Sequence, residues 1–210
     1  MTTSSKKTTT EQFKSIPPEH IMVVKRSDLF ANDSWQGVRT EGIESYLETI
    51  YTKHTFLPRP AMENDPTYKQ IIPYVIFVHD NKLFLMQRAL TASETRLRNK
   101  RSLGIGGHVR QEDIEDKNLL EWATREFNEE VSYTGSLEME FIGLLNDDSN
   151  DVGKVHCGLV MLAHGDSSDI KVQSELKSGT LVPISECFIH YDELESWSQM
   201  VLTALKNRIV

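Results

Sequence analysis

The chain has 210 residues, of which 39% are hydrophobic and 26% charged, so it can bury a core and form either one domain with appendages or two small domains. Its net charge of −8 argues against non-specific binding to a nucleic acid polymer, although local basic clusters or a divalent cation could still bind phosphates. Apolar runs all fall short of the roughly 18 residues of a membrane span, and we expect no membrane partner.

The beginning of the chain and the cysteines indicate the cellular setting. Residues 1–19 are rich in threonine, serine and lysine and lack an apolar segment, which predicts a disordered tail and argues against a signal peptide. The only cysteines, Cys157 and Cys187, have no CxxC spacing. We therefore expect neither a disulfide framework nor a zinc knuckle. We expect a cytoplasmic protein with two buried thiols.

Residues 20–70 are expected to form an N-terminal α/β extension packed on the main domain. Ile21–Val24 predicts a short strand, and a helical spacing of apolar residues predicts an amphipathic helix over Gly42–His54. A proline-containing connection follows. Trp35 and this helix are expected to be the core of the extension, and a homodimer contact is the alternative.

Residues 71–210 are expected to form the main domain. Ile71–Val78 and Leu83–Gln87 are β-rich runs around a hairpin signature. The glycine-rich segment 102–109 is unsuited to a helix. A helix is expected near Asn118, which has capping-box spacing to Glu121. Its apolar stripe would be Leu119, Leu120, Ala123, Phe127 and Val131.

The remaining elements predict a layered α/β core. Strands are expected over Leu137–Leu145 and Val155–Ala163, with a polar loop between them, and over Gly179–Val182. A last helix is expected over Asp192–Lys206. Its inward side chains would be Leu194, Trp197, Val201, Leu202 and Leu205.

Three glutamates on the helix near Asn118 carry the strongest chemical signal. Glu126, Glu129 and Glu130 have offsets of 0, 3 and 4 and therefore share one helix face. Like charges this close repel one another unless a cation lies among them. Carboxylate oxygens suit magnesium or manganese, which also bind the phosphate oxygens of a substrate. The preceding Gly106-Gly107 would let backbone approach such a ligand closely.

Arg125-Glu-Phe-Asn-Glu-Glu-Val resembles the helical half of the Nudix box, G-x5-E-x7-R-E-U-x-E-E-x-G-U, with Gly107 as its leading glycine and Tyr133 near its end. The likeness extends from about Ile71 to Cys187. It implies an α/β/α sandwich around a mixed β-sheet. It also implies a magnesium-dependent hydrolase that cleaves the diphosphate of a nucleoside diphosphate linked to another moiety.

The loop half of the box departs from the family pattern. The fifth-spaced position after Gly107 is Asp113 in place of glutamate, and eleven residues separate it from Arg125 where the pattern has seven. Counted back from Arg125, the first glutamate position falls on Lys117. Ser132 replaces the usual glycine after the helix. These departures bear on substrate handling more than on metal binding.

The resemblance implies a role for each residue of the box. Glu126, Glu129 and Glu130 would bind Mg2+ or Mn2+ with the Gly107 carbonyl, while Arg125 and Gly106 would be structural. The general base, which the resemblance does not assign, would be a glutamate such as Glu129, Glu130 or Glu175. Asp147 and Asp148 are the rivals of Glu175.

Several other residues have a structural and a functional interpretation. Among the basic residues 88–101, Arg88 and Arg101 are expected to bind substrate. The others are expected to belong to an ordinary solvated loop. His108 is expected to be a hydrogen-bonded structural residue. Tyr74 and Phe77 could stack on a base, but core packing is favoured for both.

Two further functions compete with hydrolysis. A catalytically weak or inactive Nudix-like regulatory module would bind a nucleotide without cleaving it, and the altered loop half favours this alternative. The three glutamates favour catalysis, since a pure binder does not need them. Isomerase chemistry on an isoprenoid diphosphate would need an active-site cysteine, and neither cysteine has a suitable position.

Overall fold

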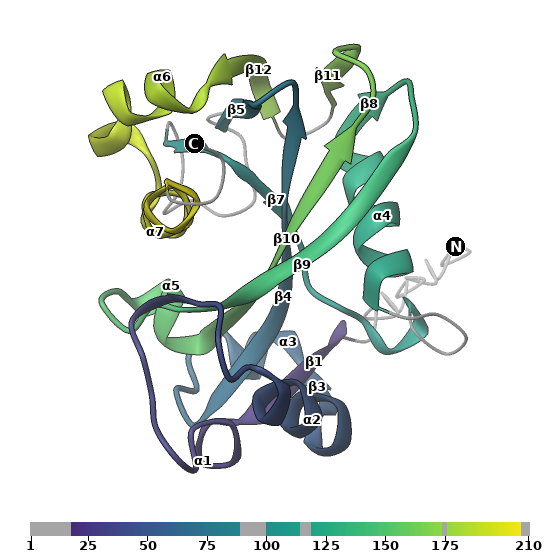
Figure 1. Cartoon of the computed structure of the whole chain (residues 1–210). Coiled ribbons are helices and arrows are strands. Elements are labelled where there is room, and N and C mark those ends of the chain that lie inside the picture. Colours follow the sequence, from purple (N-terminus) through teal and green to yellow (C-terminus); the bar gives the residue numbers. More distant parts are fainter. Residues whose placement is uncertain (1–17, 89–99, 114–118, 174–175, 207–210) are drawn as a thin grey trace, which may run out of the picture.

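The computed structural model describes residues 18–88, 100–113, 119–173 and 176–206. One mixed sheet runs in the order β12-β5-β4-β10-β9-β2, with β1, β3, β6 and β7 joined to it. Helix α4 covers one face of the sheet and helices α6 and α7 the other (Figure 1). The expected α/β/α sandwich around a mixed sheet is confirmed.

The strands of the large sheet are β1 (His20–Lys25), β2 (Gly37–Arg39), β3 (Thr55–Pro58), β4 (Tyr68–His79), β5 (Lys82–Arg88), β6 (Arg101–Ser102), β7 (Gly104–Gly106), β9 (Leu137–Asn146), β10 (His156–Gly165) and β12 (Leu176–Pro183). Strands β8 (Val131–Tyr133) and β11 (Ile170–Val172) form a separate pair. The helices are α1 (Arg26–Leu29), α2 (Glu44–Lys53), α3 (Arg59–Met62), α4 (Leu119–Glu130), α5 (Asp151–Val155), α6 (Ile184–Ile189) and α7 (Ser196–Leu205).

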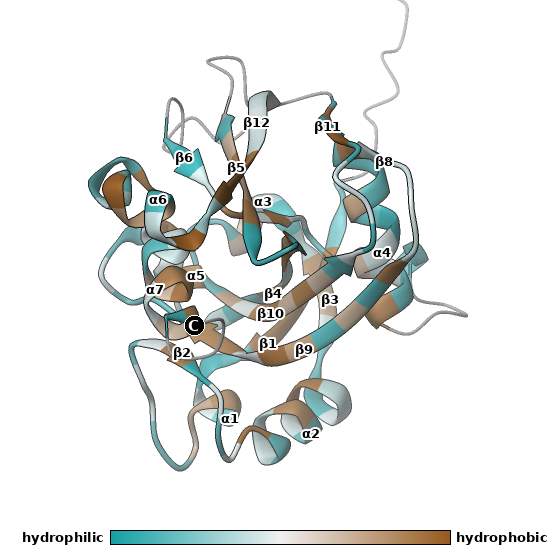
Figure 2. Cartoon of the chain, turned by 45° about the horizontal axis from the view of Figure 1, so that its top comes forward, coloured by the Kyte–Doolittle hydropathy of each residue, from teal (hydrophilic) through white to brown (hydrophobic). Residues whose placement is uncertain are grey.

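Strand β4 separates two hydrophobic cores. It pairs in parallel with β10, and both strands are apolar on both sides, as expected for strands covered by helices on either face. Its odd-numbered residues, such as Val75 and Phe77, face the core under α4. Its even-numbered residues, such as Ile76 and Val78, face the core under α6 and α7. Hydrophobic residues accordingly concentrate where β9 and β10 cross the middle of the molecule (Figure 2).

The expected hairpin between β4 and β5 is present. Asp80 and Asn81 have φ angles of 47° and 57°, the left-handed conformation that a two-residue hairpin turn requires. Asparagine and aspartate tolerate this conformation better than most residues. The local sequence therefore fixes both the turn and the register of Val78 against Leu83.

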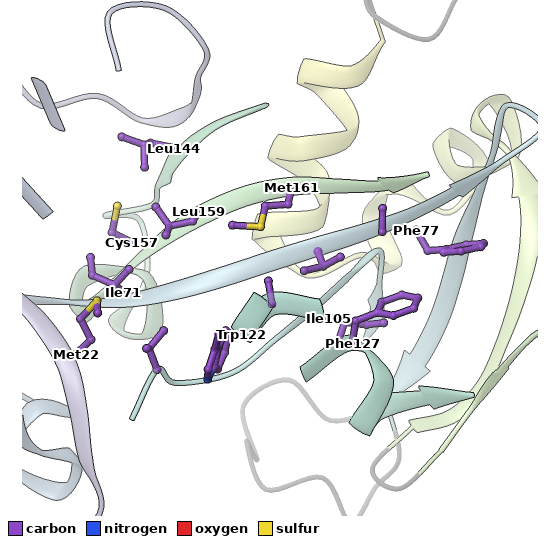
Figure 3. Packing of buried hydrophobic residues seen from close by; sticks show 14 of the residues in the cluster. Met22, Ile71, Phe77, Ile105, Trp122, Phe127, Leu144, Cys157, Leu159 and Met161 are labelled. Atoms are coloured by element: carbon purple, nitrogen blue, oxygen red, sulfur yellow. The ribbon is translucent and has the colours of Figure 1, made fainter. Parts of the chain in front are cut away.

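Helix α4 packs with most of the expected stripe, since Ala123, Phe127 and Val131 are buried and Leu119 packs on the same core. Leu120 was predicted to face inward but is 42% exposed, and that prediction is wrong. Trp122 is fully buried in its place, with Ala123 and Phe127. Figure 3 shows Trp122 and Phe127 directed toward the strands, and the Phe127 ring stacks on Phe77 at 5.8 Å. The bulky indole decides the rotation of the helix, because it buries more apolar area than a leucine.

The C-terminal region is divided more finely than expected. The helix predicted over 192–206 begins only at Ser196, and the short helix α6 precedes it. A six-residue helix shows too little periodicity to be recognised in sequence. Of the five expected inward residues, Leu194, Val201, Leu202 and Leu205 are buried, while Trp197 is partly buried.

Residues 20–70 share the sheet of the main domain. Strand β1 lies between β3 and the first residues of β4, with Val23 opposite both Thr55 and Gln70. Trp35 packs edge-to-face on Phe30 and Tyr46, as expected for the core of the extension. The division at residue 70 stays a prediction. Among the described helices, none combines the length and the apolar character needed to cross a membrane.

Candidate metal and diphosphate site

Helix α4 presents its glutamates beside its buried face. Trp122, Ala123 and Phe127 anchor one side of the helix in the core. Glu126 lies at the edge of this buried side, with its side chain 18% exposed, whereas the Glu129 side chain is 56% exposed. Solvent exposure of the carboxylates therefore increases along this helix face, from Glu126 to Glu129.

Gly107 lies against Glu126 because it has no side chain. A Cβ atom on Gly107 would lie 2.8 Å from Glu126 Oε2, closer than such atoms approach in proteins. Gly106, one residue earlier, would place a Cβ 2.3 Å from the Pro73 carbonyl oxygen on β4. The glycine pair thus allows the loop to pass between strand β4 and the glutamate helix.

Arg125 connects both halves of the box. Its Nη2 lies 3.1 Å from Glu126 Oε1 and 3.0 Å from Asp113 Oδ1, and its Nη1 donates to Glu129. The resemblance implied a structural arginine that pairs with a box glutamate, and the geometry has this form. Since Arg125 takes Oε1 of Glu126, Oε2 is the oxygen that faces Gly107.

Asp113 closes the loop although eleven residues separate it from Arg125. Its carboxylate accepts hydrogen bonds from Arg110 Nε at 2.8 Å and Nη2 at 3.0 Å. The indole N–H of Trp122 also donates to it, at 3.1 Å. Sequence reasoning missed Arg110 and Trp122 as partners, because neither belongs to the box pattern. The i, i+3 spacing of Arg110 and Asp113 was the available signal.

The two partly buried carboxylates, Glu126 and Asp113, have opposite pKa shifts. Burial raises the pKa of Glu126; Arg125 opposes the shift, while Glu129 and Asp113 add to it. Burial also acts to raise the pKa of Asp113, but hydrogen bonds from Arg110 and Trp122 outweigh it and lower that pKa. Asp113 is therefore a stable structural anion, and Glu126 is a carboxylate in need of further positive charge.

These residues fit a hard divalent cation. The donors are carboxylate oxygens and glycine backbone, which magnesium and manganese prefer. Glu126 Oε2 faces Gly107, and a Cβ at that position would force the carboxylate to shift. Within the described part of the chain, however, no three acidic, histidine or cysteine side chains are already grouped to hold an ion. To bind the ion, Glu129 would have to leave its ion pair with Arg125. Its side chain can do so because it is exposed.

Comparisons with known proteins identify the family. No family model matches the chain. It is 34% identical over 202 residues to the protein YmaB of Bacillus subtilis (strain 168), across 90% of this chain and 98% of YmaB. The crystal structure of Tm1382, which carries the name of a Nudix hydrolase, matches with 30% identity and a TM-score of 0.76, over 90% of this chain and 100% of that one. The chain belongs to the Nudix hydrolase family.

A more distant neighbour shows the same fold. The Nudix domain of NrtR from Shewanella oneidensis, crystallised with ADP ribose, has 13% identity and a TM-score of 0.53. The match covers 68% of this chain and 89% of the NrtR domain. At this identity the likeness extends to the fold alone.

The remaining residues predicted for the Nudix site lie apart from the box or outside the described residues. Glu175 and the side chain of Arg88 lie outside the described residues. Arg101 is ion-paired, with Nε 2.6 Å from Glu193 Oε2. Most of the basic loop, residues 89–99, also lies outside the described residues.

Asp147 and Asp148 are committed to structural contacts in this Nudix hydrolase. Asp147 is fully buried and accepts hydrogen bonds from Gln36, Ser149, Asn150 and Ser196. Asp148 receives both terminal nitrogens of Arg26, at 2.9 and 2.6 Å. Both carboxylates are occupied by these donors, so neither supports the role of general base.

The side chains with two interpretations are structural. Tyr74 and Phe77 are 4% and 1% exposed, and each packs in one of the two cores. This agrees with the expected core packing of both side chains. His108 is hydrogen-bonded to Gln70, at 2.7 Å. Cys157 and Cys187 are both buried, and burial raises their pKa values to about 12 and about 11. Neither thiol is available for isomerase chemistry.

Proposed function

We propose that this Nudix hydrolase uses Mg2+, or Mn2+, to hydrolyse the diphosphate of a nucleoside diphosphate linked to another moiety. The Nudix fold supports pyrophosphate hydrolysis in nucleoside diphosphate derivatives. The observation that carries the proposal is the position of Glu126 Oε2, which lies 2.8 Å from where a Cβ of Gly107 would be. Glu126 belongs to the helix that also bears Glu129 and Glu130.

The residues of the box divide the work between binding and positioning. Glu126, Glu129 and Glu130 would hold the metal, and Gly107 would approach it through its backbone. Arg125 and Asp113 would keep Glu126 in place through their ion pair. When bound, a divalent ion neutralises the diphosphate and lowers the pKa of a nearby water.

Hydrolysis then needs one carboxylate as a base. The water oxygen forms a bond to phosphorus while the bridging P–O bond breaks, and an ionised glutamate takes the proton of the water. Glu129 and Glu130 are candidates on α4. Glu175 remains a further candidate, supported by Gln173, whose backbone N–H donates to the Glu130 carbonyl oxygen at 2.8 Å. This contact ties the chain just before Glu175 to the end of the glutamate helix.

The test is hydrolysis of a panel of nucleoside diphosphate derivatives by the purified chain with Mg2+. Glu129→Gln and Glu130→Gln are expected to lower kcat at least about a hundredfold if they remove metal binding or the base, since general acid–base catalysis alone contributes about 10²–10⁴-fold. Glu121→Gln, an exposed glutamate on the same helix, is the matched control. Absence of turnover on every diphosphate, or equal activity in all variants, would overturn the proposal.

A regulatory module is the second candidate. It is favoured by the altered loop half of the box, in which Asp113 stands at the glutamate position and eleven residues separate it from Arg125. The same panel separates the two functions, because a regulatory module would bind a nucleotide without releasing a product. The two buried thiols support a reducing compartment such as the cytoplasm. A homodimer stays a prediction.

A further inference from the structure

The loop that follows Gly107 is held by the N-terminal part of the chain. The backbone N–H of Met22 on β1 donates to the Val109 carbonyl oxygen at 2.7 Å. The next residues, Ile21 and Arg110, form an antiparallel bridge. In Figure 1 the segment after β7 passes beside β1 on its way to α4. Two consecutive loop residues thus continue the sheet that β1 belongs to.

The residue between Gly107 and Val109 is held by Gln70. His108 Nε2 lies 2.7 Å from Gln70 Oε1, and Gln70 is fully buried. The amide nitrogen of Gln70 donates to the Met62 carbonyl oxygen at 3.0 Å. Because that bond fixes the orientation of the amide, Gln70 presents its oxygen to His108, and the imidazole N–H donates.

The same nitrogen of His108 also meets His156 on strand β10. His156 Nε2 lies 3.4 Å from His108 Nε2, and the two ring centroids are 5.5 Å apart. His156 Nδ1 lies 2.7 Å from the Val152 carbonyl oxygen, which sets the tautomer of His156. His108 Nε2 is therefore held by two side chains whose own orientations are set by backbone carbonyls.

These contacts compensate for the freedom of the glycine pair. Gly106-Gly107 has no side chains to restrict it, and the position of Gly107 relative to Glu126 has to be set by its neighbours. The next three residues are each fixed from outside the box, by Gln70, Met22 and Ile21. We infer that Gln70, through His108, is a positioning residue that sets Gly107 against Glu126 for metal binding. The inference rests on the proposed function.

Gln70→Leu tests this role, with Mn2+ alone as the probe and electron paramagnetic resonance of the free ion as the readout. Leucine fills the buried site but removes both hydrogen bonds. Residues that orient metal-binding groups typically change affinity about 10–100-fold, and we expect Mn2+ to bind at least tenfold more weakly. Asn146→Leu is the matched control, because Asn146 is also a fully buried side-chain amide. Its hydrogen bonds go to Trp35 and Asp148, which do not belong to the box.

Each outcome separates positioning from a general loss of stability. Weaker Mn2+ binding in Gln70→Leu than in Asn146→Leu, at a temperature where both are folded, supports the inference. Equal affinities in the two variants overturn it. If Gln70→Leu does not fold, His108→Ala replaces it, with tenfold weaker binding expected and unchanged binding overturning the inference. Wild-type protein that binds no Mn2+ overturns the metal-dependent function as well.

Discussion

Asp113 and Arg125 are joined across the remodelled half of the Nudix box, with Oδ1 3.0 Å from Nη2. The Asp113 side chain is only 7% exposed, and Arg110 and Trp122 bind the same carboxylate. An acidic residue shorter than glutamate, followed by a longer segment than the family pattern has, thus reaches the arginine that holds Glu126. The departure from the family spacing leaves this ion pair in place.

Asp113→Ala is expected to destabilise the protein by about 3 kcal/mol, because it leaves two arginines and an indole N–H without their shared acceptor. Urea unfolding measures the loss. Glu112→Ala is the control, since Glu112 is 65% exposed and lies 3.8 Å from the same Arg110. We expect that variant to stay within about 0.5 kcal/mol of wild type. Similar losses in both variants would contradict the role given to Asp113.

Glu126→Gln is expected to raise the melting temperature of the metal-free protein at neutral pH. Burial raises the pKa of Glu126, so the folded state disfavours its ionised form. The resulting penalty develops as pH rises above the ordinary glutamate pKa and is complete once pH exceeds the raised pKa of Glu126. A neutral amide removes it.

The same variant is expected to lose stabilisation by Mg2+. Wild type should gain about 2.7 kcal/mol when Mg2+ is at a hundred times its dissociation constant, and Glu126→Gln should gain little. Differential scanning fluorimetry with and without Mg2+ measures both effects. A variant less stable than wild type without metal, or equally stabilised by Mg2+, would show that Glu126 is structural.

Asp148→Asn is expected to destabilise the protein by about 3–5 kcal/mol. The Lys69 side chain is fully buried, and its Nζ lies 3.0 Å from Asp148 Oδ1, so the variant leaves a buried ammonium without its anion. Denaturant unfolding is the measurement. Lys69→Met in the same background should recover part of the loss, because an apolar side chain suits this site. Asp151→Asn, at an 86% exposed aspartate paired with Lys154, should have little effect.

The contribution of Asp148 is also expected to depend on pH. The hydrogen bonds from Arg26, more than any other contact, hold the pKa of Asp148 well below its usual range. Its contribution to stability is therefore present above the ordinary aspartate pKa and is lost as pH falls below it. The difference in unfolding free energy between wild type and Asp148→Asn should shrink on acidification below about pH 4. A constant difference down to about pH 2 would contradict this assignment.

Cys157 and Cys187 are expected to resist thiol reagents in the folded protein. Burial raises their pKa values to about 12 and about 11, so little thiolate forms at pH 8. A disulfide reagent should detect two thiols in the denatured protein. In buffer without denaturant, both thiols should react much more slowly than they do in the denatured protein. Fast modification of the native protein would show that one of the thiols is accessible.

Local spacing along the chain determined the features that depend on neighbours within a few residues. The offsets of Glu126, Glu129 and Glu130 place them on one helix face in any fold, because the helical repeat is fixed by the backbone. Asp80-Asn81 determined the β4–β5 turn for a similar reason, since few residues tolerate its φ angles. Both features could therefore be predicted from the sequence.

Only the tertiary structure decided the partners of these elements. Asp113 meets Arg125 across eleven residues, Gln70 meets His108, and Trp122 rather than Leu120 turns inward. These contacts depend on how α4 and β1 pack against β4 and on the loops closing between them. Helical or strand periodicity does not carry that information. The sequence thus determined which carboxylates share one helix face, and the packing decided which residues hold them in place.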